Sequence, residues 1–418
     1  MIDPGAVRIS DFDYVLPAER IAQFPLAERD ASKLLIYNRG IINQDIFSNI
    51  DCYLPGNSLL VFNDTKVIRA RLLFKKQTGT QIEIFCLEPI APATEIQAAF
   101  HQQSGSTWKC LVGNLKRWKT GLLMCEGMHD GFSYRLFAEK ADVTGDGSLA
   151  ISFHWEPPEK SFSEILELTG SIPLPPYIHR PTEPSDAIRY QTIYAAQEGS
   201  VAAPTAGLHF TESLFKRLDN KGIKSDKVTL HVGVGTFRPV SVSKIRDHVM
   251  HREKIVVSRQ TIDRLLNNLD RPVFAVGTTS ARTLESLYWL GAGILLTNPW
   301  FQPGIAQWTP YNGNQAENIS VSQSLETLLR YMDSRGMEVY SGETQLMIVP
   351  GYRFRMISGL ITNFHMPQST LLLLVAAMLG DDWKRVYNYA LSNDFRFLSY
   401  GDSCLFFNPV NMEQVKNE

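Results

Sequence analysis

Three apolar segments of the sequence each end in a loop of small and polar residues, and Ser or Thr then opens a helix. They span residues 200–219, 272–281 and 359–379, and residues 397–402 repeat the strand and loop without a clear helix. The loops hold His, Asn, Asp and Thr, which can hydrogen-bond a polar ligand. Loops at the carboxyl ends of strands are where α/β sheets bind ligands, and helix N-termini favour anionic groups. The spacing therefore predicts one shared pocket.

Residues 227–239 have a strand pattern in which alternate positions differ in kind. Thr229, His231, Gly233 and Gly235 share one face, which leaves room for a ligand or for another backbone close by. A tight bend over a hydrogen-bonded histidine is the alternative reading. Neither a third glycine with a helix nor a Walker motif follows, so a dinucleotide or P-loop site is not predicted.

Two histidines three residues apart, His248 and His251, would share a helix face. A metal site is conceivable there. The segment lacks the H-E-x-x-H order of common zinc proteases, and histidines at this spacing more often serve as hydrogen-bonding residues. We therefore predict no metal.

The composition is that of a folded, soluble chain of two to three domains. The 418 residues are 44% hydrophobic and 20% charged, and the net charge of −2 gives no overall attraction to nucleic acid. The five cysteines are odd in number and form no C-x-x-C pair, which disfavours disulfide scaffolds and cysteine zinc sites. The first residues do not resemble a signal peptide, and the longest apolar run, Leu371 to Leu379, is about half of what a bilayer needs. We expect a cytoplasmic protein without membrane segments.

The order of strand and helix signals predicts an α/β fold with an insertion. Residues 65–156 contain six short, partly alternating strand patterns separated by turns, which favours a small antiparallel β-barrel. Residues 1–64 plus 157–418 alternate between strands and helices and are expected to form the main α/β domain. Residues 288–343 are less regular and are interpreted as an elaboration of that domain with one helix near 325–332.

The barrel segment has a basic bias. Residues 65–120 contain nine Lys and Arg but only three Glu. The charges could form a solvated surface or a phosphate-contacting one, with Trp118 available for stacking on a base.

Nine motifs of the chain, in order and over nearly its whole length, resemble one bacterial family. They are DFDYVLP (11–17), PLAERD (25–30), FNDTKV (62–67), APTAGLHFT (203–211), TLHVGVGTFRPV (229–240), HVMHRE (248–253), VGTTSARTLES (276–286), LITNFHMPQSTL (360–371) and SYGD (399–402). The family is that of the S-adenosylmethionine:tRNA ribosyltransferase-isomerases of queuosine biosynthesis.

The resemblance implies a reaction that the residues alone do not give. The ribosyl group of S-adenosylmethionine is transferred to 7-aminomethyl-7-deazaguanine at the tRNA wobble position and isomerised, giving epoxyqueuosine, adenine and methionine. It also implies an α/β domain with an inserted β-barrel. S-adenosylmethionine is then a consumed co-substrate, and neither a further cofactor nor an obligate protein partner is implied.

The chemistry of that reaction assigns expected roles to the loops. A base must take the C5′ proton that the sulfonium acidifies, and histidine moves protons near neutral pH. We expect His209, His231 and His365 as acid/base candidates, in no fixed order, and Asp402 as a reader of the modified base. The substrate-binding candidates are Thr205, Gly207, Gly233, Gly235, Thr278, Thr279, Ser280 and Asn363, with Arg238 or Arg282 for the methionine carboxylate. The tRNA-binding candidates are Lys66, Arg69, Arg71, Lys116, Arg117 and Lys119.

Three alternatives stay open at this point. The barrel stretch and the long segment 288–343 depart from the family pattern, so a diverged paralogue could use another ribosyl acceptor. A tRNA-binding protein without activity would not require three loop histidines together with Asp402. A metal-dependent hydrolase built on His248 and His251 is the remotest reading.

Overall fold

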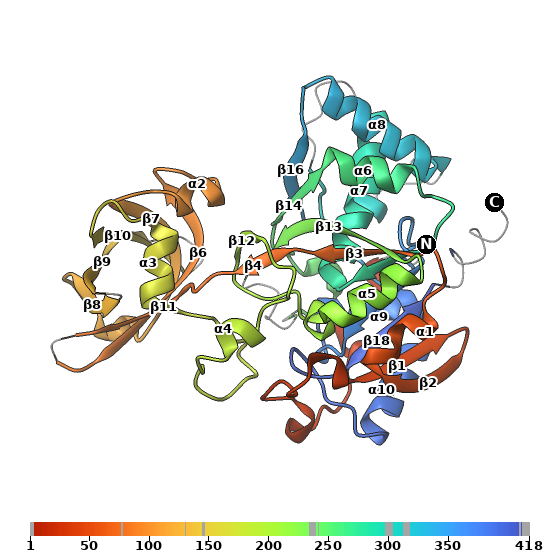
Figure 1. Cartoon of the computed structure of the whole chain (residues 1–418), viewed down its shortest axis with the longest axis horizontal. Coiled ribbons are helices and arrows are strands. Elements are labelled where there is room, and N and C mark those ends of the chain that lie inside the picture. The colour runs from red at the N-terminus through yellow and green to blue at the C-terminus, as the bar shows by residue number, and fades with distance from the viewer. Residues whose placement is uncertain are drawn as a thin grey trace.

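The computed structural model describes residues 4–76, 78–129, 131–143, 147–233, 240, 242–296, 304–311, 318–408 and 411. Within these residues the strands form a nine-stranded sheet, a seven-stranded sheet and a two-stranded ribbon. The ribbon pairs β4 (Thr65–Val67) with β12 (Gln197–Ser200) in parallel and lies where the chain crosses between the two larger sheets (Figure 1). The mixed α/β class predicted from the sequence is confirmed.

The main sheet is parallel at its centre and antiparallel at its edges. β3 (Leu59–Asn63) pairs in parallel with β13 (Lys224–His231) and β15 (Val273–Val276), and β15 pairs in parallel with β17 (Gly359–Asn363). The carboxyl ends of these four strands therefore meet at one edge, which brings their loops together. The strand order is β16 (Val339–Thr344), β14 (Glu253–Ser258), β13 (Lys224–His231), β3 (Leu59–Asn63), β15 (Val273–Val276), β17 (Gly359–Asn363), β18 (Ser403–Phe407), β1 (Lys33–Asn38) and β2 (Ile41–Ile46).

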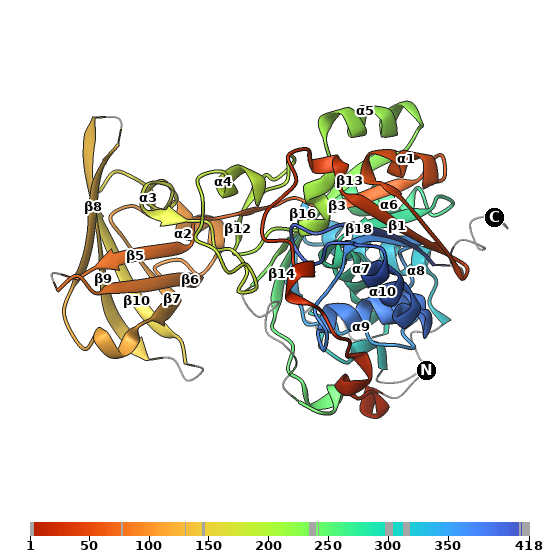
Figure 2. The same cartoon turned by 90° about the horizontal axis from the view of Figure 1, so that it is seen from below.

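Helices cover both faces of the main sheet, because strand residues alternate between the two sides. Phe62 packs with Leu214 and Leu218 of α5 (Glu212–Asn220) in one core, whereas Val61 packs with Leu284 of α7 (Thr278–Leu296) in the other. Figure 2 shows α5 and α1 on one side of the sheet and α7, α9 and α10 on the other. The main-domain helices are α1 (Ile50–Tyr53), α5 (Glu212–Asn220), α6 (Arg259–Leu266), α7 (Thr278–Leu296), α8 (Val321–Asp333), α9 (Thr370–Leu379) and α10 (Asp382–Ser392).

The second sheet is antiparallel, curled, and has its own core, which includes Trp108, Phe153 and Phe162. All six strands predicted between residues 69 and 153 are confirmed. Among the described residues these strands form an open sheet, in which β11 and β8 are the two edge strands. The order is β11 (Gly170–Ser171), β5 (Arg71–Lys75), β6 (Gln81–Ala91), β7 (Gly105–Gly113), β10 (Leu149–Glu156), β9 (Phe132–Val143) and β8 (Leu123–His129). The short helices α2 (Ile96–Phe100) and α3 (Phe162–Thr169) pack here, and α4 (Asp186–Arg189) follows on the return path.

The segment 288–343 is more integrated than its composition suggests. The expected boundary at 288 falls inside α7, which continues to Leu296 through the buried Tyr288 and Trp289. Gly291 lowers helix propensity, but a Cβ there would lie 2.0 Å from the Ser324 carbonyl oxygen, so glycine allows α8 to pack closely. The predicted helix near 325–332 is confirmed as α8, and β16 then joins the edge of the main sheet.

Candidate functional site

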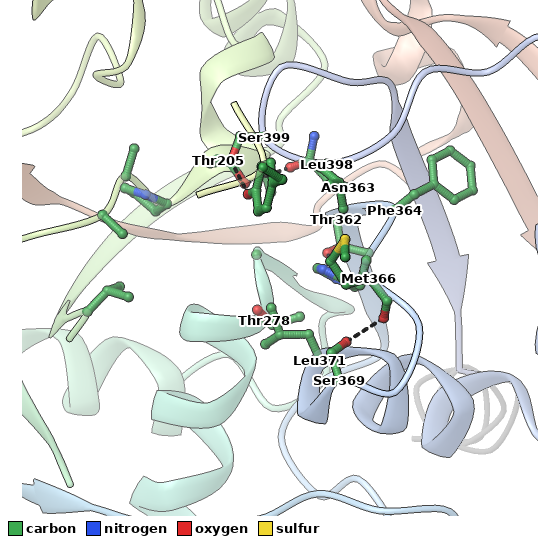
Figure 3. A pocket seen from close by; sticks show the side chains of 18 of the residues that line it. Thr205, Thr278, Thr362, Asn363, Phe364, Met366, Ser369, Leu371, Leu398 and Ser399 are labelled. Carbon is green, nitrogen blue, oxygen red and sulfur yellow. Dashed lines mark hydrogen bonds between the residues drawn. The ribbon is translucent and has the colours of Figure 1, made fainter. Parts of the chain in front are cut away.

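A cavity of about 400 Å³ lies at the carboxyl ends of β15 and β17, as the loop pattern predicts (Figure 3). The N-termini of α7 and α9 open onto it, with Thr278 and Ser369 on the same side (Figure 3). Of the predicted site residues, Thr205, Thr278, Thr279, Asn363 and His365 line it. No Lys, Arg, Asp or Glu is among the described residues that line this cavity.

Asn363, the last residue of β17, is held by a chain of hydrogen bonds. Its Oδ1 accepts a bond from Thr205 Oγ1 at 3.0 Å, and its Nδ2 lies 3.1 Å from His209 Nε2. Because the amide nitrogen donates, Nε2 must accept, and the proton of the neutral ring lies on Nδ1, 2.8 Å from Ser32 Oγ. His209 is buried behind Asn363 and does not line the cavity, so it can orient the amide but not touch a ligand there.

His365 is the one of the three candidate histidines that lines this cavity. Its Nε2 lies 3.0 Å from Thr362 Oγ1, and its carbonyl oxygen accepts a 2.5 Å hydrogen bond from the Tyr14 hydroxyl. Burial lowers the pKa of His365 to about 3, since desolvation penalises the imidazolium. The ring is therefore neutral at pH 7.

His231 lies in a second cavity of about 450 Å³, between the main sheet and strands β6 and β7. Gly233 lines this cavity too, together with His251, Lys109 and other polar residues. His231 Nδ1 lies 3.0 Å from Thr65 Oγ1, and burial lowers the pKa of His231 to about 4. Val232 lines both cavities, so the two sites adjoin without His231 facing the first.

Four predicted residues are committed to contacts within the protein. The Asp402 carboxylate accepts bonds from the Lys33 and Arg396 backbone N–H groups and from the Arg396 guanidinium. Arg282 is buried, pairs with Glu253 and donates to a backbone carbonyl. Ser280 Oγ donates to the carbonyl one helical turn earlier.

A Cβ at Gly207 would meet the Tyr194 hydroxyl oxygen at 1.8 Å, so this glycine serves packing. None of the four lines the first cavity, and Gly235 and Arg238 lie outside the described residues.

The basic candidates divide into a group that forms ion pairs and a group with exposed side chains. Lys66, Arg69 and Arg71 form ion pairs of 2.8, 3.0 and 2.7 Å with Glu198, Glu167 and Glu83, respectively. Lys116, Arg117 and Lys119 have exposed side chains.

Base stacking by Trp118, which belonged to the phosphate-contacting interpretation of this segment, is excluded by its position. Trp118 is fully buried in the core of the second sheet, and its Nε1 donates to the Gly121 carbonyl. The charges on either side of it suggest an exposed run, but the turn Leu115–Arg117 directs the indole inward.

The structure describes no group of three or more His, Cys, Asp or Glu residues that could hold a metal, and no described helix is long and apolar enough to cross a bilayer.

Two further features were not predicted from the sequence. Tyr177 and Ser399 line the first cavity and are joined by a 2.7 Å hydrogen bond between their hydroxyls. Leu398 beside them has φ +70°, a conformation uncommon for a residue with a side chain. The SYGD motif could have indicated Ser399, whereas Tyr177 follows a proline-rich stretch without a chemical signal.

Burial of His209 makes a prediction about stability and pH. Burial lowers the pKa of His209 to about 4 in the folded protein, whereas the unfolded chain takes up the proton near its ordinary value of 6.5. Folding stability should therefore fall as the pH drops from 6.5 towards 4, by at most about 1.4 kcal/mol per pH unit for this group. The free energy of unfolding, measured with urea at several pH values, should change less steeply with pH in His209→Gln than in the wild type. The exposed control His154→Gln should behave like the wild type. Equal slopes would contradict the assignment.

The fold and the first cavity define an α/β ligand-binding protein whose site lies at the ends of parallel strands. A sequence model of the family described as queuosine biosynthesis protein matches residues 9–406, and the chain belongs to this family. A relative from Trichlorobacter lovleyi, named S-adenosylmethionine:tRNA ribosyltransferase-isomerase, is 37% identical over 95% of this chain and 99% of its own length. One of the same name from Geotalea uraniireducens is 38% identical over 96% and 100%. The crystal structure of S-adenosylmethionine tRNA ribosyltransferase from Thermotoga maritima is 29% identical, covers 94% of this chain and 99% of that one, and superposes with a TM-score of 0.45.

Proposed function

We propose that this protein is an S-adenosylmethionine:tRNA ribosyltransferase-isomerase. In this reaction the ribosyl group of S-adenosylmethionine moves to 7-aminomethyl-7-deazaguanine in tRNA and isomerises, giving epoxyqueuosine, adenine and methionine. The observation that carries the proposal is the full-length match to relatives bearing this name. A paralogue with another acceptor and a non-catalytic tRNA-binding protein have no such observation in their favour.

The first cavity is the proposed site for S-adenosylmethionine. Its volume lies in the range of small-molecule pockets, about 300–1,000 Å³. Thr205, Asn363 and Ser399 supply hydroxyl and amide groups that can bond the ribose and adenine. The substrate is consumed, and we propose that no further cofactor and no metal takes part.

His365 is the proposed base for the C5′ proton. It lines the same cavity as the polar groups that would hold the ribose, and it is the one of the three candidate histidines that does so. His209 is proposed as a positioning residue, because its ring fixes the Asn363 amide from behind. His231, in the adjoining cavity, is proposed to act on the acceptor, whose amine must be neutral to attack.

The second sheet is the proposed tRNA contact. Residues 65–156 would then act as a small inserted barrel attached to the catalytic domain of residues 1–64 and 157–418. The side chains of Lys116, Arg117 and Lys119 support this role, because they are exposed and can contact phosphates. The other three basic candidates already pair with carboxylates, namely Lys66, Arg69 and Arg71. We place the reaction in the cytoplasm, where tRNA is modified and where the five free cysteines fit a reducing environment.

Charge reversal tests the tRNA contact. The triple variant Lys116→Glu/Arg117→Glu/Lys119→Glu should bind tRNA more weakly, because lost phosphate contacts remove counterion release. The slope of log affinity against log salt should become shallower by up to about 0.9 per lost contact. Lys384→Glu, an exposed lysine on α10, is the control and should leave the slope unchanged. An unchanged slope in the triple variant would make the run an ordinary solvated surface.

Substrate omission tests the reaction itself. Adenine release should require S-adenosylmethionine and tRNA carrying 7-aminomethyl-7-deazaguanine, and should stop when the tRNA carries guanine at that position. Equal release with both tRNAs would point to another acceptor, and no release with either would contradict the proposed activity.

A further inference from the structure

The N-terminus of α7 differs from most other helix starts in this protein. α7 begins at Thr278 directly after Gly277, which has φ +91° and no side chain to cap the helix. Ala281 N–H bonds to the Gly277 carbonyl, but the first N–H groups of a helix have no acceptor within it. The described residues provide no acceptor for the N–H groups of Thr278, Thr279 and Ser280. Six other described helices are capped instead by side chains, namely Glu95, Ser161, Thr211, Ser258, Ser320 and Ser369.

Two unpaired hydroxyl groups accompany these N–H groups. Thr278 is only 7% exposed and lines the cavity, and the structure gives its hydroxyl no hydrogen bond among the described residues. Thr279 also lines the cavity, and its Oγ1 is buried without a partner. Burying the Thr279 hydroxyl without a partner is unfavourable, and the Thr278 hydroxyl beside it is also free to bond, so this end of the cavity is prepared for a ligand that accepts hydrogen bonds.

The charge of the cavity indicates which ligand group fits. No described side chain of Lys or Arg lines it. Arg282 lies outside the lining, where its Nη1 pairs with Glu253 and its Nη2 is buried without a hydrogen-bond partner. The N-terminus of a 19-residue, largely buried helix carries a partial positive charge that favours an anion. Hydroxyl and N–H donors converging on that end match the oxygen atoms of a carboxylate.

We propose that the N-terminus of α7, through the Thr278 hydroxyl and the backbone N–H groups of residues 278–280, binds the methionine carboxylate of S-adenosylmethionine. The inference rests on the proposed function, because it requires S-adenosylmethionine in this cavity. If the carboxylate binds at the N-terminus of α7, the ribose would lie in the part of the cavity formed by Asn363 and His365.

The test compares S-adenosylmethionine with decarboxylated S-adenosylmethionine, which differs by the carboxylate alone. Calorimetric titration of the full-length protein gives a preference, the ratio of the two dissociation constants. The wild type should prefer S-adenosylmethionine by about tenfold or more, since hydrogen bonds to a charged group are the strong ones. Thr278→Val should reduce this preference about tenfold by weakening only S-adenosylmethionine, whereas Thr278→Ser, which retains the hydroxyl, should keep it.

The matched control is Thr283→Val on the same helix. Its hydroxyl donates to the Thr279 carbonyl and does not line the cavity, so the preference should stay at the wild-type value. If circular dichroism shows that both proteins are folded, an equal preference in wild type and Thr278→Val would overturn the carboxylate site. This result would not contradict the proposed function. Absence of S-adenosylmethionine binding by the wild type would overturn the proposed function as well.

Discussion

Replacing His365 with alanine is expected to lower kcat by about 10²–10⁴-fold, the usual effect of removing a general base. The dissociation constant of S-adenosylmethionine should change little, because the polar groups of Thr205, Thr278 and Asn363 stay in the cavity. The direct readout is loss of deuterium from C5′-labelled S-adenosylmethionine in the presence of modified tRNA. This exchange should stop in the variant.

The control for His365 is His101→Ala, an exposed histidine at the end of α2. It should retain wild-type turnover and exchange. A folded His365→Ala protein that still exchanges C5′ hydrogen at the wild-type rate would show that another group takes the proton. The same assay on His209→Ala separates the roles, because a positioning residue should raise KM as well as lower kcat.

Replacing Arg282 with methionine is expected to lower the free energy of unfolding by about 3–5 kcal/mol, because it removes the positive member of a buried ion pair with Glu253. The double variant Arg282→Met/Glu253→Gln should be more stable than the single one, since no uncompensated charge remains. Urea unfolding measures both.

Two comparisons decide whether Arg282 is structural. Arg135→Met removes one partner of an ion pair that is 53% exposed on both sides, and it should have a much smaller effect on stability. S-adenosylmethionine affinity of the folded Arg282→Met protein should match the wild type. A weaker affinity at unchanged stability would instead favour Arg282 as the carboxylate ligand.

The sequence predicts where the site lies better than it predicts the roles of the individual residues. Strand and loop patterns predict that the ends of β15 and β17 converge, because parallel strands must present their loops at one edge. Which side chain faces the cavity depends on tertiary contacts. His209 and His365 have similar local surroundings in the sequence, but only His365 faces the cavity, and Asn363 stands in front of His209.

Charged residues were the least predictable. Arg282 lies on a helix beside the expected loop, and its partner Glu253 comes from a strand 29 residues earlier in the chain. Lys66 and Arg69 follow the same rule, because they pair with Glu198 and Glu167 from distant segments of the chain, and such pairs leave no periodic signal. Trp118 shows the same limit for burial, since one turn decides whether an indole faces water or the core.

The most direct test of the central claim follows the ribose itself. The protein is incubated with S-adenosylmethionine labelled with ¹³C in all ribose carbons and with tRNA carrying 7-aminomethyl-7-deazaguanine, and the digested nucleosides are then examined by mass spectrometry. We predict an epoxyqueuosine nucleoside that contains the complete labelled ribose skeleton, with adenine released in equal amount. Adenine release without label in the tRNA would contradict ribosyl transfer to this acceptor.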